Sequence, residues 1–283
     1  MTRRRQPTAR QERLGAELRK LREAAGFKAR EAASLLGTDS AHMSLIESGF
    51  SGVSEVRVRQ LAAHYSCTDS KLVDALAAMA TDQTRGWWEE YRGKLATAFL
   101  DLSELEHHAA FRWDVDFLYI PGLLQTESYA HALFSYMNPQ HAGPEIECWV
   151  QHRMRRKIII ARPNPMLYEA VIHEAALHIR VGDRAETRAQ LDRVLELSEE
   201  NHITVRVIPF DLDRFAGAGS AMAYAGGPVP KLDTVVRDSP DGTGFVGAEA
   251  QLNRFRMIFH KLESVSLEAK TSRDFIHRMA KKL

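Results

Sequence analysis

Residues 18–67 read LRKLREAAGFKAREAASLLGTDSAHMSLIESGFSGVSEVRVRQLAAHYSC. Their apolar side chains recur at the three- and four-residue spacing of amphipathic helices. Gly26 and Gly37 interrupt this spacing, and glycine commonly ends a helix because it adopts the left-handed cap conformation without strain. Starting slightly upstream, the pattern predicts five short helices. Their apolar positions are, in order, Leu14, Leu18, Leu21 and Ala25; Ala32, Leu35 and Leu36; Met43 and Ile46; Val56, Val58, Leu61, Ala62 and Tyr65; and Leu72, Val73, Leu76 and Met79.

The third predicted helix follows a sharp turn at Gly37 and begins after Asp39, a favourable N-cap residue. Met43 and Ile46 lie three positions apart and are expected to face inward, which leaves the opposite face open. A short helix that follows a tight turn has the size that enters the major groove of DNA. We therefore predict a helix-turn-helix in which the third helix contacts base edges.

The outward side chains of this helix are the candidates for base contacts. Ser40, His42 and Ser44 are able to form hydrogen bonds with base edges, and Ala41 is able to contact a thymine methyl group. An alternative for His42 is that, at the third helical position, it only completes the cap with Asp39.

Basic residues provide candidate phosphate contacts. Lys28 and Arg30 begin the second helix, close to where its first turn would face a phosphate. Residues 1–12 are predicted to form a flexible basic arm that follows the DNA backbone or minor groove, with an inert tail as the alternative. The arginines of this arm that we expect to contact DNA are Arg3, Arg4 and Arg5. Arg57 and Arg59 are further candidates.

The charge distribution favours a nucleic-acid partner for the amino-terminal part. Residues 1–85 hold 14 Lys and Arg against 10 Asp and Glu, whereas the remainder holds 24 against 27. A basic end on a mildly acidic body is typical of phosphate binding. A solvated charged tail is the other interpretation.

A length of 283 residues predicts about two domains. The polar segment TDQTRG at 81–86 is the expected boundary, giving a helix-turn-helix domain at 13–82 and a carboxyl-terminal domain at 87–283. No run of about 18 apolar residues exists, so no membrane span is expected. The only cysteines, Cys67 and Cys148, lie far apart, which suits a reducing cytoplasm.

The carboxyl-terminal domain alternates helical and strand patterns. Trp87, Trp88 and Tyr91 are expected on a helix that continues towards Phe111, with the Trp pair at an internal seam or a subunit contact. Further helices are predicted near 123–137, 145–160, 186–200, 248–262 and 267–283. Strands are predicted near 117–120, 166–172, 203–209, 220–225, 233–237 and 243–246. The expected fold is a mainly α helix-turn-helix domain followed by a larger α+β domain.

Two patterns suggest enzyme chemistry, but neither meets its requirements. His173 and His178 are five residues apart, whereas a helical zinc motif needs two histidines four apart on one face. Gly242, Gly244 and Gly247 spell a dinucleotide-binding motif, but turn residues precede them where a strand is required, so a hairpin is favoured. We therefore expect no catalytic residue, no metal and no cofactor.

The amino-terminal run resembles the lambda-repressor-like, or XRE-type, helix-turn-helix family. The positions that carry the resemblance are Leu18, Leu21, Arg22, Ala32, Leu36, Gly37, Met43, Ser44, Ile46, Glu47 and Gly49. The family's recognition helix corresponds to residues 40–47. The sequence departs from the family at Lys28-Ala29, where Thr-Gln is common, at Asp39-Ser40, where Ser-Gln is common, and at Leu45, where Arg is common.

The remainder also resembles a known group. The segments RGWWEEY at 85–91, FLYIPGLLQTESYAHAL at 117–133, EIECWVQHRMRRKIIIARPNP at 145–165 and ITVRVIPFD at 203–211 are similar to the large domain of WhiJ-like, antitoxin-like actinobacterial regulators. This resemblance implies a cytoplasmic repressor that binds a double-stranded DNA operator and is controlled by a small protein partner encoded nearby. Because regulators of this kind bind paired half-sites, a homodimer is expected.

Two other functions stay open at this stage. One is an antitoxin-like interaction protein that masks a small partner and uses DNA binding for autoregulation. The other is an enzyme with a DNA-binding accessory domain.

Overall fold

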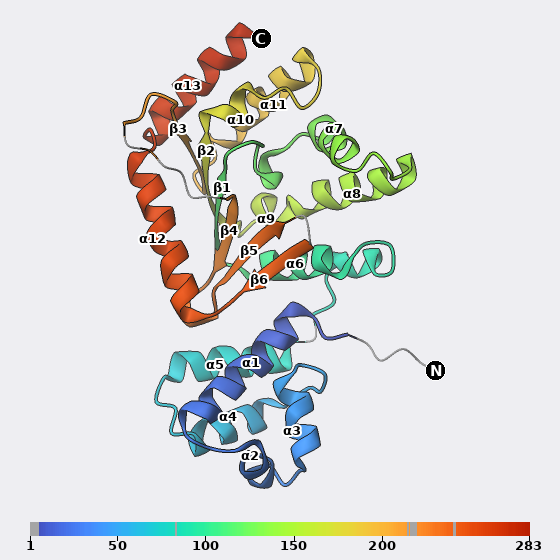
Figure 1. Cartoon of the computed structure of the whole chain (residues 1–283), viewed down its shortest axis with the longest axis vertical. Coiled ribbons are helices and arrows are strands. Elements are labelled where there is room, and N and C mark those ends of the chain that lie inside the picture. Colours follow the sequence, from blue (N-terminus) through green and yellow to red (C-terminus); the bar gives the residue numbers. More distant parts are fainter. Residues whose placement is uncertain (1–5, 83, 214, 216–219, 240–241) are drawn as a thin grey trace. The chain divides into compact units, whose positions relative to one another are not determined.

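In the computed structural model, the described residues are 6–82, 84–213, 215, 220–239 and 242–283. The chain divides into two compact units (Figure 1). The first, called here the helical unit, comprises residues 1–89 and 229–232. The second, called the sheet unit, comprises residues 90–228 and 233–283.

The helical unit contains the five predicted helices. They are α1 (Ala9–Ala24), α2 (Ala29–Leu35), α3 (Ser40–Glu47), α4 (Glu55–His64) and α5 (Ser70–Thr81). Four of them begin after a Thr, Asp or Ser whose side chain accepts a hydrogen bond from a backbone N–H of the first turn, so their starts are encoded locally. Helix α1 begins earlier than its apolar pattern indicates, so residues 9–12 of the predicted arm are helical.

One apolar core holds these helices together. Leu18 and Met43 are each 1% exposed and Ile46 is 2% exposed, as the helical spacing predicts. Burial of each such side chain contributes about 1.5–3 kcal/mol. Val56 was predicted to join this core but is 64% exposed, because it lies about 200° around α4 from the buried Val58.

The sheet unit is built on a six-stranded mixed sheet with the order β3-β2-β1-β4-β5-β6. The strands are β1 (Phe111–Asp116), β2 (Leu167–His173), β3 (Ile203–Ile208), β4 (Met222–Gly226), β5 (Thr234–Ser239) and β6 (Gly242–Val246). Strands β1, β2 and β3 are parallel, and β4, β5 and β6 continue the sheet in antiparallel pairs. The larger part of the chain is therefore α+β, as predicted.

Helices cover both faces of this sheet. The helices of the sheet unit are α6 (Thr97–His108), η2 (Gly122–Leu124), α7 (Glu127–Met137), α8 (Gly143–Arg156), α9 (Ile158–Ala161), α10 (Glu174–His178), α11 (Arg184–Leu197), α12 (Glu249–Val265) and α13 (Ala269–Lys282). Two further short helices are η1 (Trp87–Tyr91), which spans the boundary at residue 89, and η3 (Pro230–Leu232), which belongs to the helical unit. Helix α12 packs on one face, and α11 and α13 pack on the other (Figure 1). None of the described helices combines the length and apolar character needed to cross a membrane.

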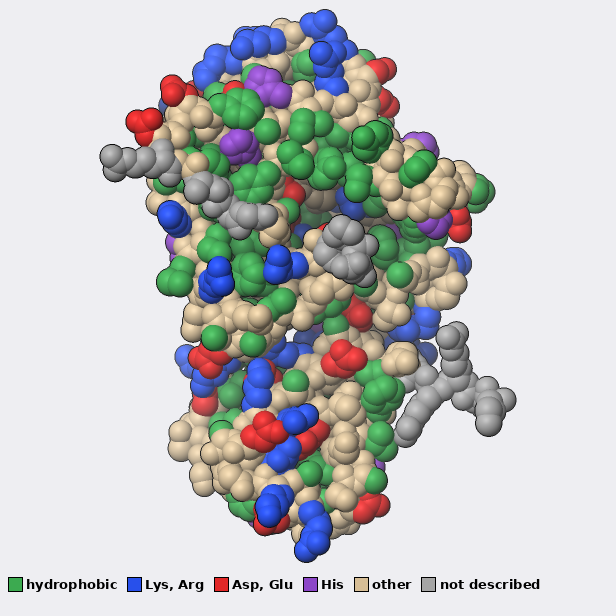
Figure 2. Space-filling view, viewed as in Figure 1, with side chains coloured by type: hydrophobic (Ala, Val, Ile, Leu, Met, Phe, Trp, Pro, Cys, Tyr) green, Lys and Arg blue, Asp and Glu red, His purple; other side chains and the backbone are tan. Residues whose placement is uncertain are grey.

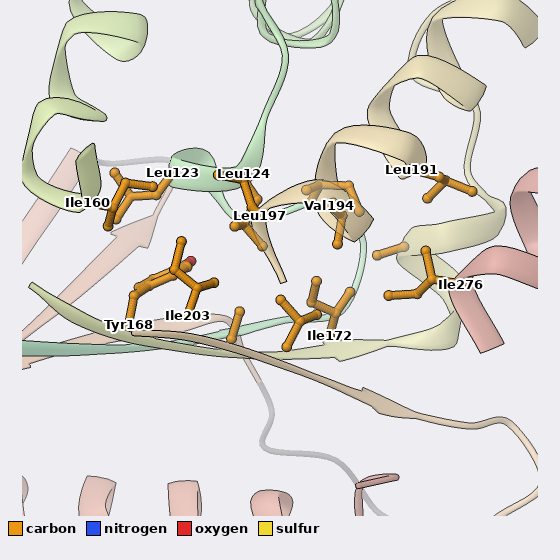
Figure 3. Packing of buried hydrophobic residues seen from close by; sticks show 14 of the residues in the cluster. Leu123, Leu124, Ile160, Tyr168, Ile172, Leu191, Val194, Leu197, Ile203 and Ile276 are labelled. Atoms are coloured by element: carbon orange, nitrogen blue, oxygen red, sulfur yellow. The ribbon is translucent and has the colours of Figure 1, made fainter. Parts of the chain in front are cut away.

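Two apolar cores lie between the sheet and the helices on its two faces. On the α11 side, Val194 and Leu197 face the strand residues Ile172 and Ile203 (Figure 3). On the opposite side, Val171 packs with side chains of α12. Alternate residues of β2 thus enter different cores, which explains why that strand reads as an almost continuous apolar run.

Two element predictions near the start of the sheet unit were wrong. The run Phe117–Ile120 is not a strand. The single helix expected from Trp87 towards Phe111 is instead the 3-10 helix η1 and a separate helix, α6, which ends at His108. The strand lies between them, at β1. Its pattern was hidden because Arg112 and Asp114, which are charged, are buried inside it and bond to each other. The backbone N–H of Ile120 donates instead to the Tyr129 hydroxyl.

Candidate nucleic-acid interface

Helices α2 and α3 form the helix-turn-helix. Gly37 has a φ of +64°, the left-handed conformation that lets the chain reverse after α2. Asp39 then caps α3, because its Oδ1 accepts a hydrogen bond of 2.7 Å from the backbone N–H of His42. The cap therefore uses the backbone of His42 and leaves its imidazole for other contacts.

The two faces of α3 differ sharply. Met43 and Ile46 are buried on the inner face. The four predicted base-contacting residues lie elsewhere on the helix. Ser40, Ala41 and Ser44 are exposed, and His42 is half-buried. Leu45 is half-buried. The outer face of α3 is thus a short polar surface within the helical unit.

A buried ion pair holds the end of α3 against α1. The Arg22 Nε donates to Glu47 Oε1 at 2.6 Å and its Nη2 donates to Oε2 at 2.9 Å. The third edge of the guanidinium donates to the carbonyl of Phe27 at 2.8 Å. The Arg22 and Glu47 side chains are only 8% and 9% exposed, and the hydrogen bond with Glu47 raises the pKa of Arg22. Both residues carry the XRE resemblance, but the sequence did not indicate that they pair.

Glycine allows α1 and α3 to approach closely. A Cβ at Gly15 would lie 2.6 Å from the carbonyl oxygens of both Ile46 and Glu47. Gly49, after α3, has a φ of +78°, and a Cβ at this position would also lie too close to the α1 backbone. The position of α3 therefore depends on backbone contact as well as on the ion pair.

The predicted phosphate contacts fall into three groups. Lys28 and Arg30 are exposed at the start of α2, where Glu31 bonds only to the Lys28 backbone N–H at 2.6 Å. Arg59 is instead committed to ion pairs with Glu55 and Asp74, at 2.9 and 2.7 Å. The predicted contacts Arg3, Arg4 and Arg5 lie outside the described residues. Lys and Arg side chains are visible at the end of this unit that carries α2 (Figure 2).

The histidines and glycines that suggested enzyme chemistry have other partners. The Nδ1 of His173 accepts a hydrogen bond from the backbone of Ala175, while the Nε2 of His178 lies 3.0 Å from Glu174 Oε1. Among the described residues, no group of three or more His, Cys, Asp or Glu side chains is placed to hold a metal. Gly242 pairs with Ser239 in the β5–β6 hairpin, as its flanking turn residues predicted.

Two family models match the chain. Residues 13–76 match one described as a helix-turn-helix domain, and residues 99–278 match one described as a domain of unknown function (DUF5753). No curated protein and no solved structure shows significant similarity. The first match includes α2, its turn and α3, and it supports a DNA-binding regulator. The chain thus combines a DNA-binding helix-turn-helix domain with a DUF5753 domain. Because the DUF5753 match covers more than half of the sequence, this chain belongs to the DUF5753 family.

Proposed function

We propose that the protein is a sequence-specific transcriptional repressor of the XRE type that binds its operator as a homodimer. The observation that carries this proposal is the open polar face of α3, held by the Asp39 cap and by the Arg22–Glu47 pair. Ser40, His42 and Ser44 supply hydrogen-bonding groups for base edges, and Lys28 and Arg30 supply charge for phosphates. No catalytic role and no cofactor are needed for this function.

Dimeric binding follows from the size of α3. A helix of 8 residues is about 12 Å long, so one copy reads few base pairs. Two copies on half-sites one helical turn apart, about 34 Å, would supply the remaining specificity.

We further propose that the sheet unit binds a small partner protein or ligand that changes operator affinity. Such control requires the effector to bind the DNA-competent and DNA-incompetent forms with different affinities. Measuring operator affinity with and without any small protein that co-purifies with the full chain tests this coupling.

The test of base recognition starts from operator fragments that the wild-type protein selects from a random DNA library. The variant Ser40→Ala/His42→Ala should lose about tenfold or more in affinity for the selected fragment, because each good base contact discriminates by about 1–3 kcal/mol. Its affinity for unrelated DNA should stay unchanged. Footprinting of the selected fragment should show two protected half-sites.

Gln60→Ala, which changes an exposed polar residue of α4, serves as the matched control and should bind both DNAs as the wild type does. If the double variant keeps its affinity for the selected fragment, or loses affinity for both DNAs equally, α3 is not the recognition helix. A single protected half-site would contradict the dimer.

A further inference from the structure

The carboxyl end of β1 is a place where open α/β sheets commonly bind ligands. The chain runs from β1 to β2 to β3 in one direction across the sheet, and β4 then lies on the other side of β1. In such sheets the crevice beyond the carboxyl ends of the parallel strands, where the strand order switches, is the usual ligand site. Asp116 ends β1 at this point, and residues 120–126, with the sequence IPGLLQT, follow it.

Buried amide and phenol groups hold residues 120–126 rigidly. The Gln125 Nε2 donates to the Ile120 carbonyl at 2.7 Å, and the Tyr129 hydroxyl accepts from the Ile120 N–H at 3.1 Å. Gln190 of α11 donates to the Leu124 carbonyl at 2.9 Å and accepts from the Thr126 N–H at 2.7 Å. Gln125, Tyr129 and Gln190 are each at most 2% exposed. This segment is therefore a fixed platform.

Two basic side chains of α8 and its C-cap converge on that platform. The Arg153 Nη1 donates to the Gln125 Oε1 at 2.6 Å, and the Lys157 Nζ donates to the Gln125 backbone carbonyl. The Arg153 guanidinium also lies 4.5 Å from the centre of the Phe134 ring. Gln125 thus brings two positive charges to one point.

These two charges differ from their neighbours in how they are balanced. Among the described residues, no carboxylate forms an ion pair with Arg153 or Lys157. Three acidic groups act on them from a longer range. Asp238, which accepts a hydrogen bond from Thr243, and Glu106 act on Arg153, and Glu127 acts on Lys157. The neighbouring cations are neutralised directly, because the buried Glu106 pairs with both Arg112 and Arg156.

The protonation states of the surrounding groups favour the binding of an anion. Burial and the nearby cations Arg193 and Arg153 lower the pKa of Lys157 to about 8. Burial and Arg156 lower the pKa of Arg153, although a guanidinium stays charged in proteins. Burial and Asp114 raise the pKa of Asp116 well above its usual range, so this carboxyl adds little negative charge to repel an anion.

We propose that Arg153 and Lys157, both held by Gln125 at residues 120–126, form a binding site for a small molecule that carries an oxyanion, either a carboxylate or a phosphate. The oxyanion accepts hydrogen bonds from the N–H groups of Arg153 that Gln125 does not use and from the Lys157 ammonium. The role of this ligand as an effector of DNA binding rests on the proposed function, whereas the binding itself does not.

The first test uses the wild-type full chain and acetylation by an N-hydroxysuccinimide ester at pH 8, quantified for each lysine by peptide mass spectrometry. Sodium phosphate, sodium acetate and sodium chloride are compared at equal ionic strength. Phosphate or acetate should slow acetylation of Lys157 by about fivefold at about four times its Kd, because protection follows occupancy. The exposed Lys71 of the helical unit should react equally in all three salts.

The anion that protects Lys157 identifies the phosphate or the carboxylate class. If neither anion slows its acetylation more than chloride does, no oxyanion site exists at Lys157. Because no DNA is present, this result is independent of whether α3 binds an operator.

The second test compares thermal unfolding of variants in the same salts. The melting temperature of the wild type should rise in the protective anion relative to chloride. Arg153→Gln and Lys157→Gln should abolish this rise, while Arg155→Gln should keep it, because Arg155 lies on the same helix but pairs with Glu90 on the surface. If the first two variants retain the rise, the anion binds elsewhere and the proposed site is wrong.

Discussion

At the scale of single residues, the Arg22–Glu47 pair joins the end of α3 to α1. Both side chains are nearly buried, and Glu47 is the last residue of α3. Removing one member of such a pair leaves an unpaired buried charge, which costs far more than losing an exposed pair. The charge of Glu47 therefore stabilises the helical unit even though it contributes nothing to DNA attraction.

Glu47→Gln should lower the free energy of unfolding of the helical unit by about 3–5 kcal/mol, because the buried Arg22 keeps only its longer, 3.5 Å contact with the exposed Glu23. Urea unfolding of the full chain measures this change. Glu55→Gln removes a partner of the exposed Arg59 and should cost less than about 1 kcal/mol. Equal losses in the two variants would show that the Arg22–Glu47 pair is not the stabilising contact.

His152 is a second residue whose environment determines its chemistry. It is 1% exposed, its Nε2 lies 3.0 Å from the Ser103 hydroxyl, and the rings of Tyr91 and Phe99 pack edge-on against it. Burial, followed by the charge of Arg156, lowers the pKa of His152 to about 3. The folded protein therefore keeps this imidazole neutral over most of the acidic range.

Stability should consequently fall between about pH 6.5 and pH 3. In this range the unfolded chain binds a proton at His152 and the folded chain does not, so the free energy of unfolding decreases as the pH decreases. His152→Gln should reduce the slope of the unfolding free energy against pH by up to the contribution of one bound proton. Urea unfolding at a series of pH values measures this slope. The lowered pKa of Glu106 acts in the same direction and remains in the variant. An unchanged slope would mean that His152 is protonated in the folded state.

At the scale of elements, the crossing of α1 and α3 determines how α3, the proposed recognition helix, is presented. Ridge-and-groove packing of two helices normally keeps their axes about 8–10 Å apart, because side chains lie between them. Here Gly15 removes the intervening side chain, and the α3 carbonyl oxygens occupy the space that a Cβ would need. The helices therefore have little freedom to shift relative to each other.

Gly15→Ala should destabilise the helical unit by about 1–3 kcal/mol, the usual cost of overpacking, despite the better helix propensity of alanine. It should also weaken specific operator binding, because α3 must move to admit the new methyl group. Gly52→Ala is the control, since a Cβ there meets nothing within 4 Å. Thermal unfolding and gel-shift titration measure the two effects, and a Gly15→Ala variant as stable as Gly52→Ala would exclude a close crossing.

At the scale of the whole molecule, charge separates the two parts of the chain. The amino-terminal 85 residues are net basic, and the remainder is net acidic. Association with DNA depends on the basic side chains that are not already paired, because each phosphate they neutralise releases counterions. Within the described part of the chain, Lys28 and Arg30 form no ion pair, whereas Arg59 is held by Glu55 and Asp74.

Lys28→Ala/Arg30→Ala should weaken binding to operator and unrelated DNA by similar factors. It should also lower the slope of log K against log salt by about 2, because each phosphate that is no longer neutralised removes about 0.9 from the slope. Fluorescence anisotropy over a series of salt concentrations measures the slope. Arg59→Ala should leave it nearly unchanged. The phosphate assignment fails if the double variant keeps the wild-type slope.

Local patterns in the sequence were enough to predict most elements. Apolar spacing indicated the five helices of the helical unit, Gly37 and Asp39 marked the turn and the start of α3, and turn residues before Gly242 indicated the β5–β6 hairpin. These features could be predicted because periodicity and caps involve residues only a few positions apart. The same rule failed at β1, where buried charges replace the alternating apolar pattern.

Tertiary structure alone decided which charged residues meet. Arg22 and Glu47 are 25 positions apart, Glu106 and Arg156 are 50 apart, and Gln125 reaches Arg153 from 28 positions away. A charged residue has the same appearance in the sequence whether it faces water, pairs in the core or remains unneutralised. The sequence by itself therefore determined the helices and the open face of α3, while the ion pair that holds α3 and the cations around Gln125 arise from packing between distant segments.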